Sequence, residues 1–151
     1  MAITLEQDVA VARPPAEAFA KLVDVEHWPT WLIASGIVRV ERLTAGDLAT
    51  GSTLRIDQRV AGRSATLEAR VTALEAPSRF AVSGKDASGI SIDIDATIEP
   101  TATGCTLRWR LKVGLPLKYR AFESMAAPQV RRAAALDLEA FRIRLESAAK
   151  G

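Results

Sequence analysis

The single cysteine and the single histidine are the first residues to consider for chemistry, because nucleophilic catalysis needs an activated group beside a base. Cys105 lies in a segment whose alternate residues are apolar, so we expect it to be buried in a strand and to behave as a small apolar side chain. His27 lies in a short polar segment and is expected to be exposed. No HExxH, Walker-type or GxGxxG pattern is present. We therefore predict no catalytic triad, no metal site and no cofactor.

Two aspartates separated by one residue could indicate a metal site or an acid–base pair. Asp93 and Asp95 lie in one alternating segment, and Arg108 and Arg110 alternate in the same way in the next. If residues 99 and 104 pair around a four-residue turn, Asp95 faces Arg108 and Asp93 faces Arg110. Opposite charges paired across strands contribute roughly 0.2–1 kcal/mol each. We interpret these four charges as a ladder on the solvent face of a sheet.

The surroundings of Asp137 decide between two interpretations of the C-terminal segment. In a predicted helix over residues 129–150, Asp137 and Arg144 fall between two apolar stripes, one containing Phe141 and the other Leu136. If only the first stripe packs on a sheet, Asp137 lies at a wet margin. If the whole arc faces a curved sheet, the carboxylate points into an enclosed space and needs a hydrogen-bond donor, a water or a ligand. The sequence leaves both interpretations open.

A similar choice arises in the predicted strands. Gln58 interrupts an apolar stripe, and Ala65, Ala69 and Ala73 leave room where larger side chains would fill a core. Bulky neighbours such as Trp109 could occupy that room, or it could remain a pocket. An apolar space with a few polar groups is typical of small-molecule sites. It is equally compatible with an ordinary core.

The composition limits the class of protein. The 151 residues suit one domain spanning residues 1–151, and 48% of them are apolar, too many for a disordered chain. No apolar run approaches the roughly 18 residues needed to span a bilayer, and the N-terminus lacks the pattern of a signal peptide. Because Cys105 has no second cysteine to pair with, we expect a reducing, cytoplasmic location.

Charge is distributed unevenly along the chain. Positions 1–107 hold 10 basic and 14 acidic residues, whereas positions 108–151 hold 10 basic and 4 acidic ones. A basic C-terminal third could favour an anionic surface, although such charge is usually a solvated face. We expect no nucleic-acid partner, because the sequence contains no recognised motif and no interleaving of aromatic and basic residues.

The hydrophobic pattern predicts an α+β domain. After a strand at residues 3–11, we expect a short helix at 16–23 and a second one after Asp24. Residues 114–127 are predicted to form a loop or a short helix before the terminal helix at 129–150. Alternation of apolar residues predicts six further strands between these helices, at 37–44, 53–61, 64–74, 79–84, 90–99 and 105–113.

This order of elements resembles the helix-grip fold, in which about seven antiparallel strands form a curved sheet around a long C-terminal helix. The stretch ARPPAEAFAKLVDVEHWPTW at residues 12–31 is similar to the opening of the polyketide cyclase/dehydratase and lipid-transport family, which belongs to the START/Bet v 1-like (SRPBCC) superfamily. The stretch LDLEAFRIRLES at residues 136–147 resembles its closing helix. The resemblance covers nearly the whole chain and is more specific for fold than for function.

The resemblance implies a cavity between the sheet and the terminal helix. Trp31 would anchor the corner formed by the two short helices, and residues 117–125 together with the short helix bearing Trp28 would form the entrance. The residues implied to line the cavity or its entrance are Trp28, Leu54, Ile56, Gln58, Leu67, Phe80, Val82, Ile92, Ile94, Trp109, Phe122, Met125, Asp137 and Phe141.

Three functions are compatible with these features. The first is binding or carrying a small hydrophobic or amphipathic ligand, oriented by Gln58 or Asp137. The second is an aromatase/cyclase-like enzyme acting on a polyketide-like substrate, with Tyr119, Glu123, Gln58 and Asp137 as acid–base candidates. The third is a non-catalytic module for a membrane surface or a protein partner, with a homodimer among the possibilities.

Overall fold

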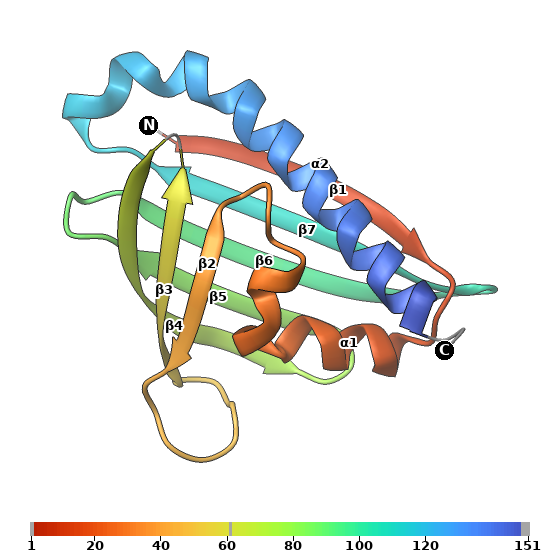
Figure 1. The fold of residues 1–151 in the computed structure, drawn as a ribbon. Coiled ribbons are helices and arrows are strands. Elements are labelled where there is room, and N and C mark those ends of the chain that lie inside the picture. Colours follow the sequence, from red (N-terminus) through yellow and green to blue (C-terminus); the bar gives the residue numbers. More distant parts are fainter. Residues whose placement is uncertain (1, 61, 149–151) are drawn as a thin grey trace.

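The computed structural model describes residues 2–60 and 62–148, in which seven antiparallel strands form one curved sheet. The strand order across the sheet is β1-β7-β6-β5-β4-β3-β2. Figure 1 shows the sheet bending around a long C-terminal helix, which confirms the predicted helix-grip fold. The strands are β1 (Ala2–Val11), β2 (Ile37–Arg42), β3 (Thr53–Val60), β4 (Arg63–Glu75), β5 (Arg79–Lys85), β6 (Ser91–Thr101) and β7 (Gly104–Gly114).

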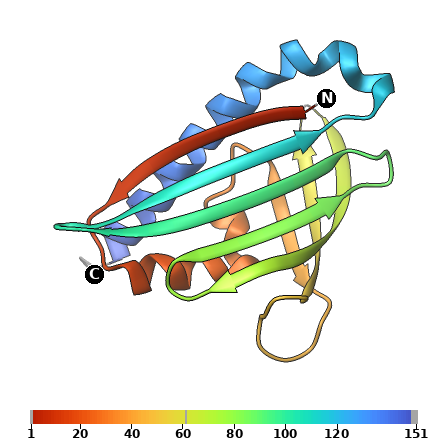
Figure 2. The ribbon, with the colours of Figure 1, turned by 180° about the vertical axis from the view of Figure 1, so that it is seen from behind.

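Two short helices follow β1, as predicted. Helix α1 (Pro15–Val23) begins at a proline, whose missing N–H costs nothing in a first helical turn. The 3₁₀-helix η1 (Val25–Thr30) brings Trp28 into the core. A second 3₁₀-helix, η2 (Leu117–Phe122), leads into α2 (Glu123–Ala148). All the helices lie on one side of the sheet, as the view from behind shows (Figure 2).

The start of the terminal helix was predicted wrongly. Helix α2 begins at Glu123, whereas the sequence predicted a start at Gln129, after Pro128. Pro128 is the sixth residue of the helix, at an exposed position, and it removes the hydrogen bond that a backbone N–H there would donate to the carbonyl oxygen of Ser124. The helix nevertheless continues through Pro128, and its added turns extend beyond the sheet (Figure 1). The predicted end at Lys150 lies outside the described residues.

The predicted register of the last two strands was also wrong. Thr101 pairs with Gly104 across a two-residue turn, so Asp95 lies opposite Arg110 and Asp93 lies opposite Lys112. The shift is two residues, because β6 continues through residues 100 and 101. A shift of two preserves the face on which each side chain lies. The charges therefore remain on the outer face as predicted, with different partners.

The partners of these charges come from neighbouring strands. Asp95 accepts two hydrogen bonds from Arg79 on β5, the shorter at 2.9 Å between Nη2 and Oδ2. Arg108 Nε lies 3.1 Å from Oδ1 of Asp8, and Arg110 Nε lies 3.1 Å from Oε2 of Glu6, both on β1. This network raises the pKa of Arg79 and of Arg108, mainly through the hydrogen bonds that they donate to Asp95 and Asp8 respectively. The ladder on the outer face is therefore a structural feature of β1, β5, β6 and β7.

Helix α2 is attached to β1 at two places. The side-chain nitrogen of Gln7 donates to the carbonyl oxygen of Arg131 at 3.0 Å. Farther along, the backbone N–H of Ala12 donates to Oε2 of Glu146 at 3.2 Å. The two helix residues, Arg131 and Glu146, lie about 22 Å apart along the axis at 1.5 Å per residue, so these bonds fix the direction of the helix over the sheet.

A candidate ligand cavity between the sheet and the terminal helix

A cavity of about 340 Å³ lies between the inner face of the sheet and the first half of α2. It occupies the end of the molecule where β3 and β7 finish and β6 begins, which we call the hollow end. Its volume falls within the range of small-molecule pockets, about 300–1,000 Å³. Of the residues predicted to line a cavity, the wall contains Trp28, Ile56, Gln58, Leu67, Val82, Ile92, Ile94 and Trp109.

The floor of the cavity is aromatic. Trp28 and Trp109 line it, with their ring centroids 6.5 Å apart in an edge-to-face arrangement. Below them, Trp31 packs edge-to-face on Trp109 at 5.7 Å and on Phe141 at 4.9 Å. Such pairs contribute roughly 0.5–1.5 kcal/mol each beyond the area that they bury. The aromatic cluster separates the cavity from the remaining interior, which we call the packed end.

Three predicted cavity residues lie in the packed end. Leu54, Phe80 and Phe141 are fully buried within the core and are not among the side chains that line the cavity. They lie on the predicted inner faces of β3, β5 and α2. The alternation of apolar residues predicts which face of a strand a residue lies on. It does not predict how far the residue lies from the hollow end, which depends on the tertiary structure.

Asp137 is buried, as in the second of the two interpretations, but it does not face the cavity. Only 2% of its surface is exposed, and it is not part of the cavity wall. Its Oδ1 accepts the backbone N–H of Ala34 at 2.7 Å, and its Oδ2 accepts that of Ser35 at 3.0 Å. Burial raises the pKa of Asp137, and the hydrogen bonds from Ser35 and Ala34 oppose that shift. A buried carboxylate needs hydrogen-bond donors, and for Asp137 these are backbone N–H groups between η1 and β2.

This backbone segment, residues 32–36, forms a strap between α2 and β3. Besides the two bonds that the strap donates to Asp137, it accepts one at the carbonyl oxygen of Ser35 from the side-chain nitrogen of Gln58, at 2.8 Å. The carbonyl oxygen of Gly36 accepts the N–H of Arg59 at 2.8 Å. Gly36 has a φ of 76°, and a Cβ there would lie 2.1 Å from the carbonyl oxygen of Arg59, so the close approach requires glycine. Leu32, Ala34 and Ser35 of the strap line the cavity.

The two predicted entrance residues on η2 and α2 point elsewhere. Phe122 and Met125 are exposed and do not line the cavity. The helix contributes other residues to the wall, namely Ala126, Gln129, Val130 and Ala133. Ala126 lies in the segment 114–127, which was predicted as a loop or a short helix, whereas Gln129, Val130 and Ala133 lie in the predicted helix but were not assigned to the cavity. Correct helical spacing from Glu123 would have placed Ala126, Val130 and Ala133 on one face.

The remaining acid–base candidates are not gathered in the cavity. Tyr119 and Glu123 lie on η2 and at the start of α2, and neither lines the wall. His27 is largely exposed, and its Nδ1 lies 2.8 Å from Oδ2 of Asp24. Cys105 is buried in β7, and burial raises the pKa of its thiol. No described side chain that lines the cavity is titratable.

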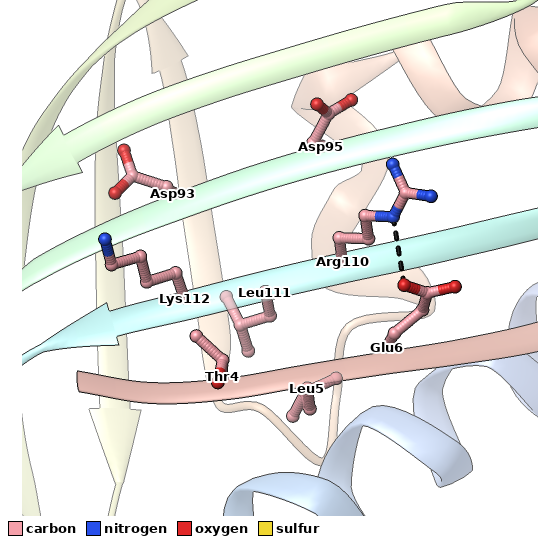
Figure 3. Close-up of a pocket in the computed structure, with 8 residues that line it drawn as sticks. All are labelled: Thr4, Leu5, Glu6, Asp93, Asp95, Arg110, Leu111 and Lys112. Carbon is pink, nitrogen blue, oxygen red and sulfur yellow. Dashed lines mark hydrogen bonds and ion pairs between the residues drawn. The ribbon is translucent and has the colours of Figure 1, made fainter.

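A second, shallower depression of about 440 Å³ lies on the outer face of the sheet. Figure 3 shows that Asp93, Asp95, Arg110 and Lys112 border it, with Glu6 bonded to Arg110. These are members of the charge ladder, and Ser83 also donates to Asp93 at 2.6 Å. The depression is the surface between alternating charged side chains on a solvent-exposed sheet. Leu111 borders both this depression and the cavity on the other face.

Two further observations concern the described residues. None of their His, Cys, Asp and Glu side chains form a group of three or more that could hold a metal ion. None of their helices combines the length and the apolar run needed to cross a bilayer.

The curved sheet, the long helix and the cavity between them define a helix-grip protein. A family model described as "polyketide cyclase / dehydrase and lipid transport" matches residues 2–146. The chain therefore belongs to this family. No match was found among curated protein sequences.

Solved structures support the same fold. A START superfamily protein from Mycobacterium smegmatis has a TM-score of 0.79 at 17% identity, covering 96% of this chain and 98% of that one. The Zhui aromatase/cyclase from a Streptomyces species has a TM-score of 0.78 at 17% identity, covering 97% and 94%. Ara h 8.0201 has a TM-score of 0.67 at 16% identity, covering 97% and 99%. At these identities the likeness concerns the fold alone.

Proposed function

We propose that this protein binds a small hydrophobic ligand in the cavity at the hollow end and acts as a binding or carrier protein. The observation that carries the proposal is the chemistry of the wall. It combines aliphatic side chains with Trp28 and Trp109, and its polar side chains are Ser35, Gln58 and Gln129. A charged group placed there would lack a counterion, whereas an apolar one would gain from burial. The ligand class is therefore an uncharged apolar molecule, or an amphipathic one whose polar end stays at the mouth.

The size of the cavity supports a small ligand. A volume of about 340 Å³ suits a molecule of drug or terpenoid size rather than a long acyl chain together with its headgroup. Gln58 uses its side-chain nitrogen to hold the strap, which leaves its oxygen as an acceptor beside the cavity. One ligand hydroxyl or amide could donate to that oxygen. Of the two side chains expected to orient a ligand, Gln58 remains the candidate, because Asp137 does not line the cavity.

The alternative is an aromatase/cyclase activity. It is supported by the family to which the chain belongs and by the fold that the chain shares with the Zhui enzyme. Such an enzyme would need a group that moves a proton or orients a reactive chain. In this cavity that role would fall to Gln58, Gln129 or a bound water. Gln58→Leu separates the two functions, because it would abolish turnover in an enzyme but lower the affinity of a carrier only in part.

Native mass spectrometry of freshly purified protein, followed by organic extraction, tests the proposal directly. We expect a co-purifying small molecule, or uptake of an uncharged hydrophobic fluorescent probe by ligand-free protein. Ala133→Trp places a large side chain in the cavity, whereas Ala135→Trp places it on the exposed side of the same helix. Loss of binding in the first variant only would support the proposal. Equal binding in both variants, or no binding by the native protein, would overturn it.

A further inference from the structure

Three large apolar side chains at the hollow end lie outside the cavity. Leu117 and Phe122 on η2 and Met125 in the first turn of α2 are 80%, 57% and 70% exposed. This part of the chain extends beyond the ends of β1 and β7, so the sheet does not cover it (Figures 1 and 2). Isolated exposed apolar residues need no explanation, but a group of them within one short segment is typical of an interaction surface.

The same part of the chain is basic. Lys118 and Arg120 lie on η2, Arg131 and Arg132 follow on α2, and all four are exposed. Between positions 114 and 136, Glu123 is the one acidic residue. None of the four basic side chains forms an ion pair with a described residue within 4 Å. Elsewhere in the molecule, Arg79, Arg108 and Arg142 are paired with carboxylates, whereas Arg59, Arg63 and Arg70 of β3 and β4 form no ion pair with a described residue.

We propose that η2 and the first turn of α2 form a docking surface for an anionic lipid bilayer. Apolar side chains that enter the interface and basic side chains that contact anionic headgroups are the two contributions that hold a helix on a membrane surface. Leu117, Phe122 and Met125 supply the first, and Lys118 and Arg120 supply the second. Apolar and basic side chains alternate along this one projecting segment. Their charge is complementary to that of anionic headgroups, and their apolar groups can enter the interface.

The docking surface adjoins the cavity. Met125 is followed by Ala126, which lines the cavity wall, and Gln129 and Val130 continue that wall one turn later. A docked molecule would therefore hold the hollow end close to the bilayer. The docking proposal does not require that the cavity bind a ligand, so each proposal can fail without the other.

Co-sedimentation with lipid vesicles tests this surface. We expect the protein to bind phosphatidylcholine vesicles that contain phosphatidylserine more tightly than vesicles of phosphatidylcholine alone, and the binding to weaken as salt is added. Lys118→Gln and Arg120→Gln should each lower the partition coefficient about fivefold, and Leu117→Ser should lower it on both kinds of vesicle. The circular dichroism spectrum and the midpoint of urea unfolding should be unchanged in these variants, which shows that they fold.

Two matched controls lie away from the docking surface. Arg70 is exposed on β4, and Leu43 is exposed in the β2–β3 loop, on the side of the molecule opposite η2 (Figure 1). Arg70→Gln and Leu43→Ser should leave vesicle binding unchanged. Equal losses in the controls, no dependence on phosphatidylserine, or no binding at all would overturn the proposal. So would a concentration-dependent dimer that Leu117→Ser abolishes, since the surface would then serve a second copy of the chain.

Discussion

The two ends of the space between sheet and helix differ in how they are filled. At the packed end, Trp31, Phe80 and Phe141 are fully buried and interlock with their neighbours. At the hollow end, the same sheet and the same helix enclose a cavity walled by residues such as Ala133 and Ile92. Side-chain volume decides the difference, because the helix contributes Phe141 and Leu138 at one end and alanines at the other. The fold therefore obtains its stability and its candidate site from different halves of one interface.

The largest expected effect is the loss of an aromatic side chain at the packed end. Phe141→Ala should lower the free energy of unfolding by about 3–5 kcal/mol, because it leaves a void beneath Trp31. Ile92→Ala at the cavity wall should cost roughly 1 kcal/mol, since that side chain is already only partly packed. Urea unfolding of both variants measures the difference. Equal costs would contradict the division into two ends.

The strap at the boundary should give an intermediate effect. Asp137→Leu removes the acceptor of the Ala34 and Ser35 N–H groups, and should cost about 1–3 kcal/mol. The hydrogen exchange of these two amides should accelerate more than that of amides in β6. Gln58→Leu, which removes a single bond to Ser35, is the milder comparison. Unchanged exchange at Ala34 and Ser35 in Asp137→Leu would show that the carboxylate does not hold the strap.

The buried carboxylate also predicts a dependence of stability on pH. Since burial raises the pKa of Asp137 above the ordinary value of about 3.9, the folded protein binds more protons than the unfolded chain between the two pKa values. Its contribution to stability therefore falls as pH rises through that window and is constant above it. The difference in unfolding free energy between native protein and Asp137→Asn should follow this course in urea titrations. A difference that grows with pH would reverse the sign and contradict the assignment.

The smallest effect is expected on the outer face of the sheet. Arg79→Gln breaks the ion pair with Asp95, in which both side chains are partly exposed. Exposed pairs contribute about 0.2–1 kcal/mol, and salt screens them. Thermal unfolding at low and high salt would measure the loss. A loss of stability comparable with that of Phe141→Ala would contradict the interpretation of these charges as solvated groups that contribute little to stability.

Residue alternation predicts the order of the strands and the face of most strand residues. It fails in β4, where a bulge between Val71 and Ala73 brings Leu74 rather than Ala73 against the core. It could not predict depth, so Leu54 and Phe80 were assigned to the cavity although they lie below it. It also could not predict register, because a shift of two residues leaves every side chain on the same face. Pro128 favours a helix boundary by its local preference, but the helix begins five residues earlier and continues through it.

The strap could not have been predicted from local sequence. Its bonds join residues that are far apart in the chain, with Asp137 separated from Ala34 by 103 positions and Gln58 from Ser35 by 23. The sequence did show that a buried Asp137 would need a donor, but the donor turned out to be backbone, which has no sequence signature. The signal that remained was Gly36, a glycine immediately before a predicted strand.

NMR of methyl-labelled protein titrated with an uncharged hydrophobic probe tests the central claim most directly. The account predicts that methyl resonances of Ile92, Ile94 and Val130 at the hollow end shift on binding, while those of Leu54 and Leu107 at the packed end stay in place. A probe that shifts methyl groups of the packed end, or that perturbs only the outer face of the sheet, would contradict it.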